Sequence, residues 1–165
     1  MYIDLLPIEG KYRGVSRHLG LKNVKLKKWQ EFTKIYDKYL DWLAKQDNSF
    51  NESVLQVLKE LRDAMLTRGS NCEIICYTDN PEEFYLGKGF LGFDAYWVNE
   101  SLSVLEGGSQ IEENFINKIN RNGLFPNYED AQVFCETQMK AMAYSEQQCE
   151  REANIRPFCI WVYQD

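Results

Sequence analysis

The chain has 165 residues, of which 44% are hydrophobic and 27% charged, and its formal net charge is −6. This length and composition fit one globular domain and exclude collagen-like, coiled-coil and disordered classes. No apolar run reaches the roughly 20 residues that span a bilayer, and Asp4 makes the start too acidic for a signal peptide. We therefore expect a cytoplasmic protein that makes no membrane contact.

The charge is distributed unevenly along the chain. Residues 1–50 contain ten Lys/Arg and six Asp/Glu, a balance of +4, whereas residues 51–165 contain nine and nineteen, a balance of −10. Residues 10–30 carry seven cations and no acid. Such a stretch can bind nucleic acid or an acidic protein, or it can be solvated or lie against the acidic remainder of the chain. The pI of about 5.0 disfavours nucleic-acid binding, because the whole chain repels phosphate.

Two helices are predicted for the N-terminal part, after 24 residues of irregular or weakly extended structure. Apolar residues at spacings of three and four predict an amphipathic helix over residues 26–45. Ser49 and Glu52 have the spacing of a capping box, which predicts the start of a second helix, and Gly69 is placed to end it. The short link between the two helices predicts an antiparallel hairpin.

From Asn71 onward, strands and helices alternate. In the predicted strand over residues 90–98, period-2 alternation places Leu91 and Phe93 on one face and Phe90 on the other. The last strand is apolar on both faces, which is typical of a strand in the middle of a sheet. The predicted elements are strands over residues 72–78, 90–98, 102–105 and 158–163, a helical turn capped by Asn80, a helix from Ser109 to a stop at Asn122-Gly123-Leu124, and a helix capped by Asn127.

These elements predict an α+β fold, in which an N-terminal helical hairpin is followed by a three- to four-stranded, mainly antiparallel sheet packed by two helices. The chain is expected to form one domain, residues 1–165. Within it, residues 1–70 would be a basic helical subdomain and residues 71–165 an acidic α+β body.

The sequence contains no catalytic or metal-binding constellation that we can identify, so we expect no enzyme activity, cofactor or metal. Gly87 to Gly92 spell G-x-G-x-x-G, but they lie at the start of a strand, which favours a hairpin or bulge role over nucleotide binding. His18 has no orienting carboxylate nearby in sequence. Five cysteines with one histidine give no common four-ligand zinc site. Four thiols are interpreted as small buried hydrophobes: Cys72, Cys76, Cys135 and Cys159.

Asp94 is an unusual carboxylate, because it lies in mid-strand among aromatic residues, where Asp is disfavoured. Three interpretations stay open. The side chain faces solvent, it bonds a neighbouring backbone group or Tyr hydroxyl, or it contacts a partner. An enzyme that uses carboxylates such as Asp94 is a further alternative, and it would require a concave pocket with convergent polar groups.

A run of short motifs between residues 90 and 134 carries a family resemblance. The motifs are Phe90-Leu91-Gly92-Phe93-Asp94-Ala95-Tyr96, Ser101-Leu102-Ser103, Asn122-Gly123-Leu124-Phe125 and Glu129-Asp130-Ala131-Gln132-Val133-Phe134. This order resembles small bacterial immunity proteins of contact-dependent growth inhibition and related polymorphic toxin systems. The resemblance implies a cytoplasmic protein that binds a cognate toxin domain, often a nuclease, and blocks its active site. It assigns no contact residue.

The acidic balance and an aromatic content of 14%, with ten Tyr and four Trp, favour protein–protein contact. An acidic face can cover the cationic surface with which a nuclease holds nucleic acid. We therefore predict a toxin-neutralising immunity protein. Nucleic-acid or regulatory binding through residues 10–30 is the alternative. The predicted partner contacts are Asp79, Glu82, Glu83, Asp94, Tyr96, Glu100 and Glu106.

Overall fold

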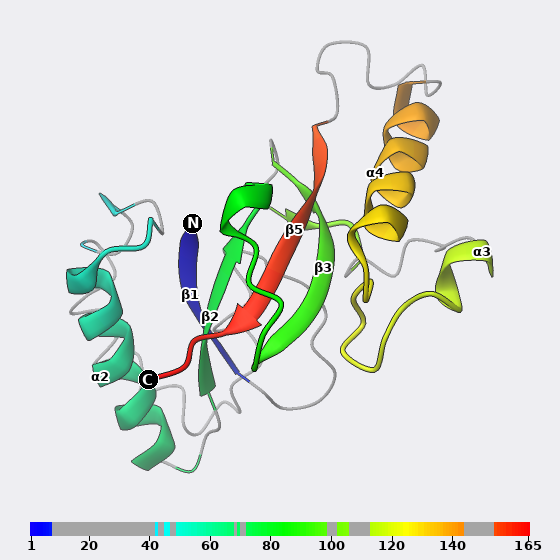
Figure 1. Ribbon diagram of the computed structural model, residues 1–165. Helices are drawn as coiled ribbons and strands as arrows, with labels where there is room; N and C mark the ends of the chain where they lie inside the picture. Colours follow the sequence, from blue (N-terminus) through cyan, green and yellow to red (C-terminus); the bar gives the residue numbers. More distant parts are fainter. Residues whose placement is uncertain are drawn as a thin grey trace.

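The computed structural model describes residues 1–7, 42, 45–46, 49–67, 69, 72–98, 102–105, 113–143 and 154–165. In chain order its elements are β1 (Tyr2–Pro7), α2 (Glu52–Thr67), β2 (Cys72–Thr78), the 3₁₀ turn η1 (Pro81–Glu83), β3 (Phe90–Trp97), β4 (Leu102–Ser103), α3 (Glu113–Ile116), α4 (Tyr128–Ala143) and β5 (Ile155–Val162). The strands form one five-stranded sheet in the order β1-β2-β5-β3-β4, with every neighbouring pair antiparallel (Figure 1). The α+β class is confirmed. None of the described helices has the length and apolarity needed to cross a bilayer.

The sheet contains one strand more than the largest number predicted. This strand, β1, lies in the part of the chain predicted to be irregular or weakly extended, and it pairs with β2 so that Ile3 lies opposite Cys76 and Leu5 opposite Ile74. Ile3 and Leu5 are buried. Alternate residues of an edge strand therefore join the core, and residues on both sides of Asn71 share one sheet.

Helix α2 is confirmed, but the predicted capping box is wrong. The helix begins at Glu52, and the Val54 N–H donates to the Asn51 side-chain oxygen at 2.9 Å, so Asn51 is the capping residue. Ser49 instead forms an isolated bridge with Tyr2. Gly69 has a φ of 72°, which confirms its predicted role in ending the helix. The first helix of the predicted hairpin lies outside the described residues.

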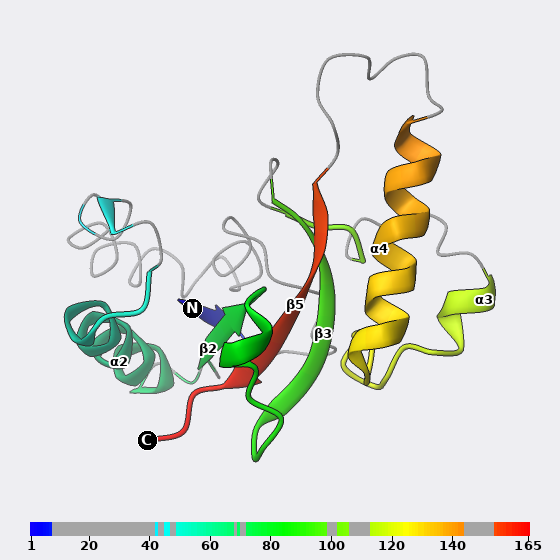
Figure 2. The same cartoon turned by 45° about the horizontal axis from the view of Figure 1, so that its top comes forward.

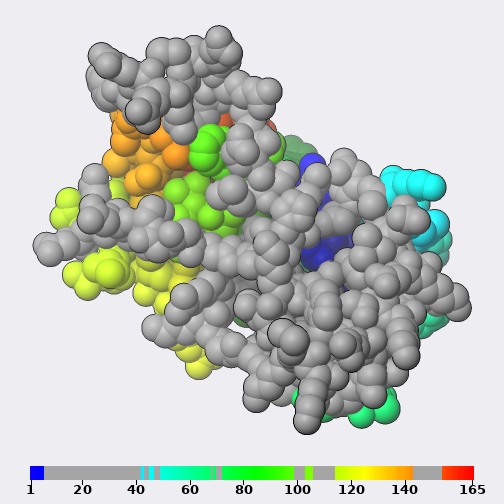
Figure 3. Space-filling model, turned by 180° about the vertical axis from the view of Figure 1, so that it is seen from behind, coloured from blue at the N-terminus to red at the C-terminus, as the bar shows by residue number. Residues whose placement is uncertain are grey.

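Helices α2 and α4 pack on the same face of the sheet, α2 against β1 and β2 and α4 against β3 and β5, and η1 lies between them (Figures 1 and 2). The space-filling view from behind again places α4, in orange, and α2 on opposite flanks (Figure 3). Alternation along the strands divides the buried residues into two clusters. The helix-bearing face includes Ile74, Cys76, Phe93, Ala95, Cys159 and Trp161. The opposite face includes Ile75, Tyr77, Tyr96, Phe158 and Ile160.

Strand β5 lies between β2 and β3, as its two apolar faces predicted. The predicted alternation of β3 holds from Phe93 onward but is wrong before it. A β-bulge between Phe90 and Gly92 leaves Leu91 as an extra residue, so Phe90 joins the cluster of the helix-bearing face and Leu91 the opposite one. One inserted residue shifts the alternation, so the strand residues before it point to the face opposite the predicted one.

The segment before α4 differs from its prediction. Of the helix expected from Ser109 to residue 121, the described residues contain only α3, which ends at Ile116. Gly123 has the predicted left-handed φ of 79°, but it belongs to a turn in which the Gly123 N–H donates to the Asn120 carbonyl at 2.9 Å. Asn127 caps α4 as predicted, because its side-chain oxygen accepts the Asp130 N–H at 2.9 Å.

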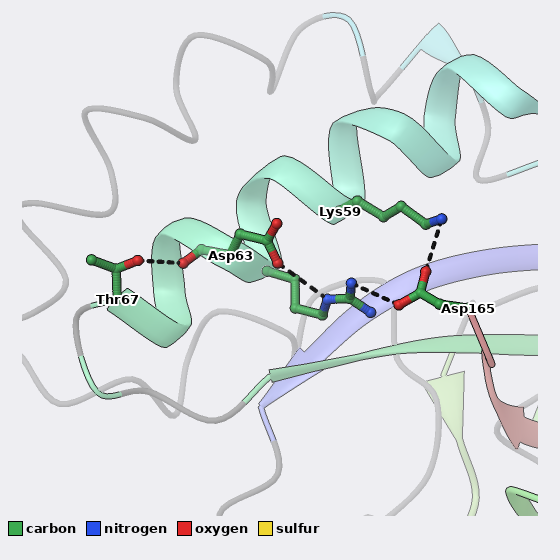
Figure 4. A network of polar contacts seen from close by, with 5 residues as sticks. Lys59, Asp63, Thr67 and Asp165 are labelled. Carbon is green, nitrogen blue, oxygen red and sulfur yellow. Dashed lines mark hydrogen bonds and ion pairs between the residues drawn. The ribbon is translucent and has the colours of Figure 1, made fainter.

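The end of the described chain is held against α2 by charge. The Asp165 carboxylate lies 2.8 Å from Lys59 Nζ and 3.0 Å from Arg62 Nη2 (Figure 4). These two cations, Lys59 first, lower the pKa of the Asp165 carboxyl. The Lys59 ammonium also lies 5.2 Å from the centre of the Tyr163 ring, so the tail and the helix meet through both charge and ring contacts.

Candidate protein-binding surface

The connection between β2 and β3, residues 79–89, crosses the helix-bearing face of the sheet and begins with a short cap (Figure 1). The Asn80 side-chain oxygen accepts the Glu82 N–H at 3.2 Å, and Pro81 occupies the first position of η1. The Thr78 hydroxyl donates to the Glu83 carboxylate at 2.8 Å. The helical turn predicted from Asn80 and Pro81 is therefore confirmed, as a 3₁₀ turn of three residues.

Aromatic contacts fix the middle of the connection to the protein body. The Phe84 ring lies 5.3 Å from the ring of Phe93 and 5.5 Å from that of Tyr128. The Tyr85 carbonyl accepts a weak hydrogen bond from the Cys159 thiol at 3.8 Å, and the Tyr85 ring lies 6.0 Å from that of Trp161. These contacts join the connection to β3, β5 and α4.

Glycines close the connection and start β3. The Gly87 carbonyl accepts the Phe90 N–H at 3.1 Å, and the Gly89 carbonyl accepts the Val162 N–H at 2.9 Å. Gly89 has a φ of 91°, and Gly92, at the bulge, has a φ of 140°. Of the two roles predicted for the G-x-G-x-x-G pattern, the bulge is confirmed at Gly92. The hairpin is not formed, because β5 lies between β2 and β3 in the sheet.

Three of the seven predicted contacts come together on this connection. Arg156 Nη1 lies 3.1 Å from the Asp79 carboxylate. The Met1 amino group lies 3.0 Å from the Glu83 carboxylate, and this amino group, followed by the Thr78 hydroxyl, lowers the pKa of Glu83. Glu82 is exposed, and within the described part of the chain its carboxylate has no ion pair.

Asp94 and Tyr96 are buried in the sheet and do not reach the surface described here. Asp94 is 0% exposed, and its carboxylate accepts a 2.6 Å hydrogen bond from the Ser103 hydroxyl on β4. The interpretation that Asp94 faces solvent is therefore wrong. Asp94 does accept a hydrogen bond from a neighbouring group, as the second interpretation predicted, although the donor in this bond is a serine hydroxyl. The Tyr96 ring packs 4.8 Å from that of Phe158. The other two predicted contacts, Glu100 and Glu106, lie outside the described residues, as does the basic stretch over residues 10–30.

Two residues of this surface, Tyr85 and Leu86, are not among the predicted contacts. They are 41% and 62% exposed, and Leu86 is the most exposed of the large hydrophobic residues in the described part of the chain. The available signal was the apolar run Phe84-Tyr85-Leu86 between acidic residues and a glycine. Apolar residues in a loop that do not follow the periodicity of a strand or a helix are candidates for contact with a partner.

The four cysteines in the described part of the chain, Cys72, Cys76, Cys135 and Cys159, are buried thiols, as predicted. Burial raises the pKa of Cys76 and Cys135 to about 12 and that of Cys159 to about 11. A thiol needs to ionise to act as a nucleophile or a strong metal ligand, so these environments oppose both roles. No three His, Cys, Asp or Glu side chains of the described residues are grouped to hold a metal ion.

The sequence matches no family model, and searches of curated proteins and of solved structures find no similar protein.

Proposed function

We propose that this protein binds a basic partner protein and neutralises it, and that the partner is the toxin domain of a polymorphic toxin system. The resemblance of residues 90–134 to immunity proteins supports the toxin as partner. The observation that carries the proposal is that Asp79, Glu82 and Glu83 leave the sheet on one connection beside exposed apolar side chains.

The physical basis is competition for cationic surface. A nuclease toxin needs lysine and arginine side chains to hold phosphates, and neutralising them with carboxylates removes the main source of nucleic-acid affinity. A net charge of −6 on the inhibitor also steers it towards such a surface and raises the association rate. The protein acts by occupying the partner, without chemistry of its own.

Co-expression tests this proposal. The partner to try is the product of the reading frame next to this gene, expressed with and without the protein in a sensitive host. Growth should be restored, and the two chains should co-purify as a complex. Absence of both the complex and the rescue contradicts the proposal.

Stoichiometry separates binding from catalysis. Purified protein should suppress the toxin's activity in proportion to its amount, until the two are equimolar. Complete suppression by a small fraction of an equivalent would instead indicate an enzyme that modifies or degrades the toxin.

A further inference from the structure

We infer that Tyr85 and Leu86 form the anchor of this interaction, entering an apolar recess on the partner whose rim carries lysine or arginine. This inference rests on the proposed function and names the surface that performs it. The two residues follow one another in the chain and both are exposed, so one short segment presents two large apolar side chains, whereas most protein surfaces carry them singly. Tyrosine and leucine together can fill a recess, and the tyrosine hydroxyl remains available for a hydrogen bond.

The anchor is held in place before any partner arrives. The residues around Leu86 are fixed by the Phe84 ring against Phe93, by the Tyr85 carbonyl on the Cys159 thiol, and by the turn from Gly87 to Phe90. A connection that is already ordered loses little conformational entropy on binding, so more of the contact energy appears as affinity. Tyrosine is among the residues enriched at binding hot spots, which cluster near the centre of an interface.

The charges beside the anchor specify a cationic rim on the partner. Residues 79–89 contain three carboxylates and one cation, Lys88, and the Glu83 carboxylate already has the Met1 amino group as its cation. Glu82 is open to a partner, and the Asp79 carboxylate is held by an arginine that is itself 54% exposed. An exposed pair of this kind contributes about 0–1 kcal/mol, so a cation of the partner can replace Arg156 at little cost. The Glu82 carboxylate repels phosphate, which favours a basic protein over nucleic acid.

The decisive experiment measures affinity for an inactivated toxin domain by calorimetry, with matched variants of this chain. Leu86→Ser removes the anchor, and Leu66→Ser is its control, because Leu66 is also exposed, at 47%, but lies in the last turn of α2. We expect Leu86→Ser to weaken binding about 30-fold or more, the factor that corresponds to a hot-spot residue. Leu66→Ser should change affinity less than about threefold. Urea midpoints of both variants verify that each is folded.

Charge is tested by Glu82→Lys against Glu136→Lys, an exposed position on α4. Glu82→Lys should weaken binding and reduce its dependence on salt, and Glu136→Lys should do neither to the same extent. A complex that tolerates Leu86→Ser as well as it tolerates Leu66→Ser overturns the anchor and leaves the proposed function standing. No complex with the wild-type chain overturns both. Oligonucleotide binding that Leu86→Ser abolishes would show that the surface recognises nucleic acid instead, and would overturn the inference.

Discussion

Replacing Gly92 with alanine places a methyl group where the backbone of another segment already lies. Its ideal Cβ would be 2.6 Å from Leu124 Cβ and 2.8 Å from the Phe125 carbonyl oxygen. That oxygen is fixed, because it accepts the Phe93 N–H at 2.7 Å, and Leu124 is fully buried. Gly92 also has a φ of 140°, a conformation that residues with a side chain rarely adopt.

The two effects add, because one is local to the Gly92 backbone and the other arises in the packing around it. Backbone strain of this kind costs about 1–3 kcal/mol, and forcing a methyl group into a filled core costs about 1–3 kcal/mol more. We therefore expect Gly92→Ala to lower the free energy of unfolding by about 2–6 kcal/mol. With a urea m-value of about 2 kcal/mol/M, the midpoint of unfolding falls by about 1 M or more.

Gly87→Ala is the matched control for this measurement. Its Cβ would meet only the tip of the Tyr85 ring, at 2.7 Å, and that side chain is half-exposed and can turn away. This variant should unfold within about 0.5 M urea of the wild-type chain, since a glycine-to-alanine change at a permissive position has a small effect of either sign. Equal midpoints for the two variants would refute the reasoning about the bulge.

Three further predictions concern side chains. Ser103→Ala removes a hydrogen bond to the buried Asp94 carboxylate and should lower the unfolding free energy by about 1.5–3 kcal/mol in urea titrations. Asp165→Asn should destabilise the protein at pH 7. Because Lys59 lowers the folded-state pKa of Asp165, the stability difference from wild type should be fully present above the unfolded pKa, about 3.9. It should shrink as the pH falls through the lower folded-state pKa, and a difference of the same size at pH 7 and pH 2 would contradict this. In a Cys149→Ser variant, Ellman's reagent should find no reactive thiol at pH 8 until urea unfolds the chain, and should then titrate four thiols.

Elements with a strong local pattern could be predicted from the sequence. Strand β5 carries apolar residues on both faces, and only a central position buries both. Strand β1 carries Ile3, Leu5 and Leu6 before Pro7, a run too short for a period to show, and β2 supplies the pairing that defines it. The exchanged faces of Phe90 and Leu91 depend on a bulge, which depends in turn on the approach of residues 120–125 to Gly92. Gly92 signalled that a bulge could form, but residues 90–98 alone do not show which residue the bulge leaves unpaired.

The residues of the candidate surface also differ in how far the sequence alone predicts them. Asp79, Glu82 and Glu83 lie within five consecutive residues, so a loop that carries one of them carries the others as well. The buried environment of Asp94 could not be predicted from the sequence, because its hydrogen-bond partner Ser103 approaches it only when β4 pairs with β3. Leu86 follows the apolar residues Phe84 and Tyr85, a pattern that would also suit a buried strand. Leu86 is exposed because contacts hold the connection in place on either side of it.

The net charge of this chain therefore predicts the sign of the partner's charge, but it does not show where the partner makes contact. Many carboxylates of the described residues already have a cation: Asp79 with Arg156, Glu83 with the Met1 amino group, Asp130 with Lys118, and Asp165 with Lys59. Such exposed pairs exchange partners at little cost, and they distinguish one basic protein from another only weakly. Long-range charge should thus govern how fast a partner arrives, whereas the dissociation rate should depend on how well Tyr85 and Leu86 fill the partner's recess. Discrimination among basic partners should follow the shape of their apolar recess more closely than their charge.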